Sequence, residues 1–144
     1  MKIALTSLVI SLLFLTGCDK EKVVNETELP SGAREFVEAH FATANIQQII
    51  KERDDLQTTY DVILDNQVKL SFDKNGDCYD AESPRALKLP DSMIPSKVLE
   101  YVQANYADHF IIEWEKDKTD QEVKLSNQVE LVFNLSGTFL RIDN

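Results

Sequence analysis

One short stretch of the chain resembles the start of a calcium-binding loop. Residues 73–77, Asp-Lys-Asn-Gly-Asp, place side-chain oxygens at alternate positions around a turn glycine, which suits a hard cation. The glutamate that should close such a loop at its twelfth position would fall at Pro84. The matching stretch later in the chain, residues 134–138, has no carboxylate. We therefore expect a plain hairpin turn and no metal site here.

Cys78 is the one candidate nucleophile, and it would need a neighbouring base to act. His40 and His109 are the chain's two histidines, and no sequence motif links either of them to Cys78. A lone cysteine in a strand usually behaves as a small buried apolar residue. No glycine-rich phosphate loop occurs either, so we expect no enzyme activity and no cofactor.

Carboxylates recur at every second position of several expected strands, where a pair could in principle act as a glycosidase does. They alternate with Lys69 and Lys124, and opposite charges across strands are ordinary on a solvated sheet face. We interpret this polar set as a candidate surface for a protein partner. Its members are Asp61, Lys69, Ser71, Glu122, Lys124 and Glu130.

Length and charge restrict the class of protein further. The 144 residues are enough for one ordinary domain or two very small ones, and 43% of them are hydrophobic. The 25 acidic and 15 basic side chains give a net charge of -10, which disfavours nucleic acid as a partner. Two cysteines provide no disulfide framework, and the soft ligands are too few for an all-protein zinc site.

The N-terminal sequence has the pattern of an export signal that ends in a lipid-attachment site. Lys2 precedes an apolar segment that is too short to span a bilayer, and Leu-Thr-Gly-Cys follows at residues 15–18. This pattern resembles the bacterial lipobox, which implies cleavage before Cys18 and acylation of its thiol. An ordinary secretory signal with a chance cysteine is the alternative. We expect a signal peptide over 1–17, a flexible polar tether over 18–28, and a domain over 29–144.

An internal repeat organises the domain. Residues 60–72 align with residues 121–133 at a shift of 61, and seven of the thirteen aligned residues are identical. Residues 35–51 match residues 100–116 at a shift of 65. We interpret the domain as a tandem duplication, with repeat one at 29–82 and repeat two at 89–144.

Each repeat is expected to contain one helix followed by strands. Apolar residues recur three and four apart over 33–44 and 98–106, with Ser31 and Ser92 as candidate N-caps. Strands are expected at 46–50, 60–64 and 68–72 and at the equivalent positions of repeat two. Tight turns should fall at Asn66-Gln67 and Asn127-Gln128. Gly76 and Gly137 should end longer turns with positive φ.

Period-two alternation predicts which face of the sheet is buried. Val62, Leu70 and Phe72 should point to the core, as should Leu131 and Phe133 of the second repeat. The polar residues between them should face solvent. The expected fold class is α+β, with tandem repeats forming one open antiparallel sheet of roughly eight strands and helices packed on one face.

The same residues resemble a family of bacterial envelope proteins. The first copy of the pattern is Leu29-Pro30, the helix segment 36–41, Tyr60-Asp61-Val62, Asn66, the strand 68–73 and Gly76, and the second copy repeats it from Leu89-Pro90 to Gly137. It is similar to the PepSY-like, or beta-lactamase-inhibitor-like (BLIP-like), periplasmic proteins of Bacteroidetes-type bacteria. The resemblance implies secretion and tandem helix-plus-sheet repeats, and it supplies no catalytic residue.

The function expected from the sequence is a non-catalytic binding module in the cell envelope. We expect a monomer that is held to a membrane by its N-terminal lipid, on the periplasmic side or surface of the outer membrane. It should recognise an envelope protein, and an inhibitor-like role is one form of such recognition. A small-ligand or cation-binding protein that uses the acidic face is the alternative. No nucleic acid partner is expected.

Overall fold

The computed structural model describes residues 21–84 and 87–143, which form two α-helices, two short 3₁₀ helices and nine strands. The helices are α1 (Ser31–His40) and α2 (Ser96–Asn105), and the 3₁₀ helices are η1 (Glu26–Glu28) and η2 (Asp91–Met93). The strands are β1 (Lys22–Val23), β2 (Ile46–Arg53), β3 (Thr58–Leu64), β4 (Lys69–Asp73), β5 (Cys78–Glu82), β6 (Ile111–Lys116), β7 (Asp120–Leu125), β8 (Glu130–Asn134) and β9 (Phe139–Asp143).

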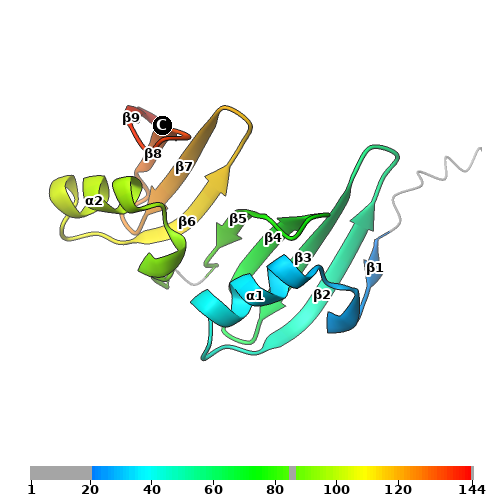
Figure 1. Ribbon diagram of the computed structural model, residues 1–144. Helices are drawn as coiled ribbons and strands as arrows, with labels where there is room; N and C mark the ends of the chain where they lie inside the picture. Colours follow the sequence, from blue (N-terminus) through cyan, green and yellow to red (C-terminus); the bar gives the residue numbers. More distant parts are fainter. Residues whose placement is uncertain (1–20, 85–86, 144) are drawn as a thin grey trace, which may run out of the picture.

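The nine strands form one open antiparallel sheet in which the strand order follows the chain from β1 to β9 (Figure 1). The α+β class is confirmed, and the sheet has one strand more than the expected eight. The extra strand is β1, which lies within the segment expected to be a flexible tether. Lys22 pairs with Lys51, and Val24 beyond the strand is buried. The expectation of a flexible tether was wrong for residues 22–24, because β1 pairs with β2 and Val24 packs in the core.

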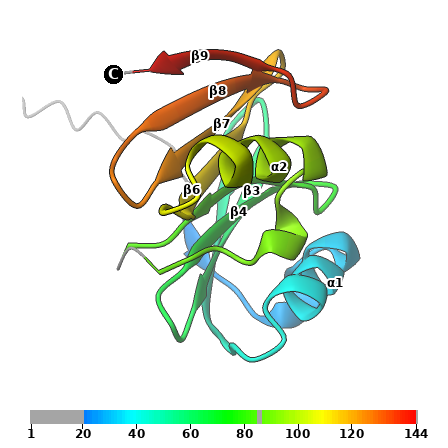
Figure 2. The same ribbon diagram turned by 90° about the vertical axis from the view of Figure 1, so that its left-hand side faces the viewer.

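The helices and strands fall into two similar units. Unit one contains α1 and β2–β5, and unit two contains α2 and β6–β9. The sheet continues between them because β5 pairs with β6, with Ala81 opposite Trp114. Figure 1 shows α1 and α2 beside the strands of their own units, and Figure 2 shows the same arrangement turned by 90°. This arrangement leaves β1 and β9 as the two edges of the sheet.

The buried face of the sheet follows the alternation expected from the sequence. Val62, Leu70 and Phe72 are fully buried in unit one, and Leu131 and Phe133 are fully buried in unit two. Each helix covers this face with one stripe of buried residues, because residues four apart lie on the same side of a helix. The buried residues are Ala33 and Val37 in α1, and Val98 and Val102 in α2.

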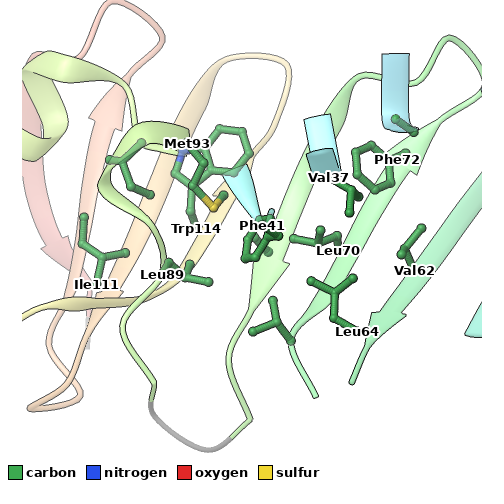
Figure 3. Close-up of a cluster of buried hydrophobic side chains, with 14 of the residues drawn as sticks. Val37, Phe41, Val62, Leu64, Leu70, Phe72, Leu89, Met93, Ile111 and Trp114 are labelled. Atoms are coloured by element: carbon green, nitrogen blue, oxygen red, sulfur yellow. The ribbon is translucent and has the colours of Figure 1, made fainter. Parts of the chain in front are cut away.

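One core extends across the junction of the units. Leu89 and Met93 come from the connection between them and join Phe41 and Leu70 in the same cluster. Figure 3 shows these side chains together with Trp114 of β6. Because the core is shared, the two units are not independent domains.

The helices do not begin as the sequence suggested. Pro30 and Pro95 occupy the N-cap positions, and no side-chain cap bond is present at either helix. Ser31 is the first residue of α1, and Ser92 lies in η2, where its hydroxyl is 2.9 Å from Nδ1 of His40. The N-cap expectation was wrong because proline fixes a suitable φ for helix entry without a capping side chain. Helix α1 also ends at His40, before the expected limit at Ala44.

The tight turns place an unusual residue in the left-handed region. Gln67 has φ of 69° and Gln128 has φ of 70°. The asparagine before each acts through its side chain: Asn66 Oδ1 accepts from the amide of Val68 at 3.1 Å, and Asn127 is arranged in the same way. The loops therefore span three residues and not two, because the Leu64 amide donates to the Val68 carbonyl.

Gly76 and Gly137 have positive φ as expected, 89° and 84°. Each also packs against the start of its own helix. A Cβ at Gly76 would lie 2.7 Å from the amide nitrogen of Ala33, and one at Gly137 would lie 2.7 Å from Cβ of Lys97. These glycines thus set the turn and also allow the helix to approach it closely.

Candidate functional site

The face of the sheet opposite the core, called the outer face here, carries two rows of side chains that cross most of the strands. Strand register puts directly opposed residues in one row, with neighbours about 5 Å apart. The first row runs through Asp61, Ser71, Asp80, Glu115, Glu122, Val132 and Arg141. The second row runs through Lys69, Glu82, Glu113, Lys124, Glu130 and Asp143.

All six residues of the surface expected from the sequence lie in these rows, but the structure divides them. In unit one, the carboxylate of Asp61 accepts from the Ser71 hydroxyl at 2.6 Å and lies 2.7 Å from Nζ of Lys69. This hydrogen bond from Lys69 to Asp61 raises the pKa of the lysine. Ser71 is only 4% exposed, so its expected place among solvent-facing residues was wrong.

The second part of the expected surface centres on Lys124 in unit two. Its Nζ lies 3.1 Å from Glu130 and 3.7 Å from Glu113, on the two strands that flank β7. Hydrogen bonding to Glu130 and the charge of Glu113 raise the pKa of this lysine. Lys124 is therefore a base held between two acids, and it offsets their mutual repulsion.

Between these two ion-paired clusters lie three acids that share the first row: Asp80, Glu115 and Glu122, called the acidic row here. Burial, followed by the charge of Glu115, raises the pKa of Asp80 to about 6. Burial and the charge of Glu130 raise the pKa of Glu122. Like charges directly opposed across strands are unfavourable for folding. The outer face is thus most acidic where the two units join.

Sequence reasoning missed two of these three residues, Asp80 and Glu115. Neither lies in the segments that the repeat aligned most closely, 60–72 and 121–133. The pairing of β5 with β6 brings them together, and it joins the end of one unit to the start of the next. The signal available in the sequence was the alternation of Asp80 and Glu82, with Glu113 and Glu115 likewise two apart.

The structure gives Cys78 no features of a catalytic nucleophile. Burial raises the pKa of its thiol to about 12, and its Sγ lies 3.5 Å from the carbonyl oxygen of Asp80. The ring of His40 is directed to Ser92 instead. A thiol held neutral by burial is a poor attacking group.

The turn at 73–77 uses its carboxylate internally. Oδ1 of Asp73 accepts from the amides of Asn75 and Asp77, at 2.8 and 3.0 Å. Asn134 Oδ1 makes the corresponding bonds to Ser136 and Thr138 in unit two. Over residues 21–84 and 87–143, no group of three or more potential metal-binding side chains was found.

A groove of about 530 Å³ lies where three hairpin ends approach one another, near the junction of the units. It is bordered by the end of the β2–β3 hairpin, the β4–β5 turn and the end of the β6–β7 hairpin. Its walls combine Leu56, Cys78 and Tyr79 with charged residues, among them Asp77, Lys116 and Lys118. Such mixed walls lack the apolar lining typical of small-molecule sites.

A model of the family described as "Putative beta-lactamase-inhibitor-like, PepSY-like" matches the chain twice, over residues 16–80 and 58–141. Together these matches cover most of the chain. The chain belongs to the PepSY-like family. The resemblance noted from the sequence is thereby confirmed, and the family description indicates no catalytic activity.

Solved structures similar to this PepSY-like protein include two proteins from Bacteroides. A protein of Bacteroides thetaiotaomicron, described as a "putative calcium-regulated periplasmic protein", is 35% identical with a TM-score of 0.81, and the match covers 86% of this chain and 97% of that one. A protein of Bacteroides vulgatus described as a "putative periplasmic protein from DUF2874 family" is 34% identical, also with a TM-score of 0.81, over 89% of this chain and 100% of its own. None of the curated proteins compared matches the chain.

The membrane attachment expected at Cys18 falls outside the residues that the structure describes. Within the described part, no helix of this PepSY-like protein is long and apolar enough to cross a membrane.

Proposed function

We propose that this PepSY-like protein is a non-catalytic, lipid-anchored module of the cell envelope that binds a protein partner through its outer face. The observation that carries the proposal is the acidic row. Three carboxylates are placed side by side at the centre of a broad sheet face, at a cost to folding that a partner bearing positive charge would offset. The raised pKa of Asp80 fits this proposal, because burial and then the charge of Glu115 make the ionised carboxylate unfavourable in the free protein.

The partner expected at this face is basic. A surface of Lys and Arg side chains would contact the acidic row across both units, and attraction between the surfaces would speed association. Inhibition of an envelope enzyme is one form that such binding could take. The family description and the sheet face both fit this role, whereas the groove beside Cys78 has charged walls.

Neutralising the acidic row tests the proposal. The triple variant Asp80→Asn, Glu115→Gln, Glu122→Gln should fold, and should no longer capture basic partners from solubilised envelopes. Capture by the wild type should weaken as salt is added, because salt screens the attraction between the charged surfaces. The matched control is Glu35→Gln, Glu38→Gln, Glu100→Gln, which removes three exposed charges from the helices. Equal capture by both triple variants and the wild type would show that the acidic row is not the interface.

Lipid anchoring is the second part of the proposal, and the string Leu-Thr-Gly-Cys at residues 15–18 supports it. The related structures are described as "putative" periplasmic proteins, which is consistent with export. Mass spectrometry of the mature protein should find an acylated N-terminus at Cys18, and the Cys18→Ser variant should leave the membrane fraction. A mature chain that begins at another residue would contradict the anchor.

Cation binding is a second candidate function, and one observation favours it. The Bacteroides thetaiotaomicron relative is described as a "putative calcium-regulated periplasmic protein". The carboxylates of the acidic row are not grouped as metal ligands among the described residues, but their combined negative charge would attract a cation to this face. Addition of Ca²⁺ should then raise the melting temperature of the wild type and leave that of the acidic-row triple variant unchanged. If both respond alike, the cation does not act through this row.

We also propose that the two units arose by tandem duplication. Left-handed Gln67 and Gln128 occupy equivalent turns, as do Gly76 and Gly137. A register shift in unit one lies beside the opposed pair Phe72 and Cys78. The equivalent shift in unit two lies beside Phe133 and Phe139. A superposition of unit one on unit two over their helices and four strands is the direct test.

A further inference from the structure

Strand β9 is an open edge of the sheet. It pairs with β8, and among the described residues no strand follows it. Leu140 and Ile142 on this strand are 50% and 47% exposed, and Leu135 in the preceding turn is 47% exposed. An edge strand that carries exposed apolar side chains is a template for pairing with another chain.

The corresponding strand of unit one is already paired in this way. β5 holds the position in unit one that β9 holds in unit two, and its outer edge is taken by the antiparallel strand β6. The fold thus shows within one chain that the last strand of a unit can accept an antiparallel neighbour. Among the described residues, the same edge of β9 has no such neighbour.

The sequence of β9 indicates which neighbour suits it. Arg141, Ile142 and Asp143 follow one another, and in an antiparallel pair of two β9 strands Ile142 can lie opposite Ile142 of a second copy. In that register each Arg141 lies opposite Asp143 of the other copy, on the outer face. Two cross-strand ion pairs would replace the local contact of Arg141 with Asp143, which is 3.2 Å and solvent-exposed. The pattern is complementary to itself.

We propose that two copies of this protein associate through β9, antiparallel and with Ile142 at the two-fold axis, so that one sheet continues through both. The interface is isologous, because each copy contributes the same strand. It is also small, since in this register only residues 141–143 of each β9 lie opposite β9 of the other copy, so association is weak in dilute solution. Attachment of both copies to one membrane would raise their effective concentration.

This inference differs from the monomer expected from the sequence. That expectation was formed without the strand order, which identifies β9 as an edge. The inference is also independent of partner recognition by the acidic row, because the residues that pair belong to β9 alone.

Disulfide trapping in membranes of cells that express the full chain tests the contact. In a Cys78→Ala background, the Ile142→Cys variant should form a crosslinked dimer when a copper–phenanthroline oxidant is added, because the two cysteines face each other. Leu56→Cys in the same background is the control, since Leu56 is 95% exposed on a distant hairpin. Crosslinking of position 142 no stronger than that of position 56 would overturn the proposal.

Charge exchange then tests the register. Arg141→Asp or Asp143→Arg, each added to Ile142→Cys, places like charges opposite one another and should weaken trapping by about tenfold. The double exchange Arg141→Asp, Asp143→Arg should restore trapping, as should coexpression of the two single variants. Unaltered trapping in the single variants would mean that the copies meet in another register, and the proposed pairing would be wrong. Melting temperatures should stay within the wild-type range, because both side chains are exposed.

Discussion

Asp80 of β5 lies directly opposite Glu115 of β6, at the point where unit one joins unit two. This pair of like charges follows from the topology, because neither unit contains it alone. Burial and the charge of Glu115 together raise the pKa of Asp80 to about 6, while Lys69 partly counteracts them. The most acidic point of the outer face is thus created by the same pairing that makes the sheet continuous.

The raised pKa of Asp80 predicts a specific pH dependence of stability. The folded protein holds a proton on Asp80 more tightly than the unfolded chain, whose pKa is 3.8, so stability falls as pH rises from about 4 to about 6. Asp80→Asn should therefore stabilise the protein above pH 6 by about 1 kcal/mol, a value reduced for solvent screening, and have no effect below pH 4. Urea unfolding across this pH range is the measurement, with Glu38→Gln as the control. A constant difference at every pH would contradict the assignment.

Core phenylalanines should contribute equally in the two units. Phe72 and Phe133 are both 0% exposed, and each meets an aromatic ring of its own helix edge to face. Truncation of either to alanine should destabilise the protein by about 3 to 5 kcal/mol, through lost burial and the cavity that remains. Because the core is shared, each variant should show a single unfolding transition. Two separate transitions would mean that the units unfold independently.

The left-handed glutamines offer sites where substitution should stabilise the protein. Gln67 and Gln128 have φ near 70°, which costs less for glycine than for any residue with a Cβ. Gln67→Gly and Gln128→Gly should each raise the free energy of unfolding by about 0.5 kcal/mol, the relief of strain being partly offset by the entropy of the unfolded chain. Lys74→Gly, in an exposed turn position with ordinary φ, is the control and should destabilise.

Replacement of the turn glycines should have the opposite effect. Gly76→Ala would place a Cβ 2.7 Å from the Ala33 amide at positive φ, so backbone strain and steric clash add. We expect a loss of about 2 kcal/mol or more. At Gly137 the obstructing atom is Cβ of Lys97, also on the helix that packs against the turn. Thermal unfolding of both variants against Asn75→Ala separates this effect from a general cost of altering the turn.

The sequence was sufficient to predict the buried face, because a period-two pattern such as Val62, Leu64 and Leu70 leaves little choice of register. The turn glycines were predictable for a similar local reason. The extra strand β1 was not, since a polar segment with two valines carries no periodic signal. The acidic row also escaped prediction: Asp80 and Glu115 are 35 positions apart in the chain, and only the β5–β6 pairing makes them neighbours.

The lysines of the outer face belong to the candidate partner surface, and the ion pairs in the structure predict what their substitution should do. Lys124 is held by Glu113 and Glu130, so its removal leaves two carboxylates on neighbouring strands without a base between them. Lys124→Gln should lower stability by about 0.5 to 1 kcal/mol in low salt, and the loss should shrink as salt is added. The raised pKa of Lys124 means that its contribution to the stability of the fold is complete below pH 10.5 and disappears as pH rises through the higher folded pKa.

The same variant also tests the proposed interface. A basic partner bound by the acidic row should compensate for the loss of Lys124, because its cations would replace the missing ammonium group. Capture of a basic partner by Lys124→Gln should therefore be at least as strong as by the wild type, whereas the acidic-row triple variant should lose it. If Lys124→Gln and the triple variant both captured the partner more weakly than the wild type, binding would depend on the lysines as well as on the acids.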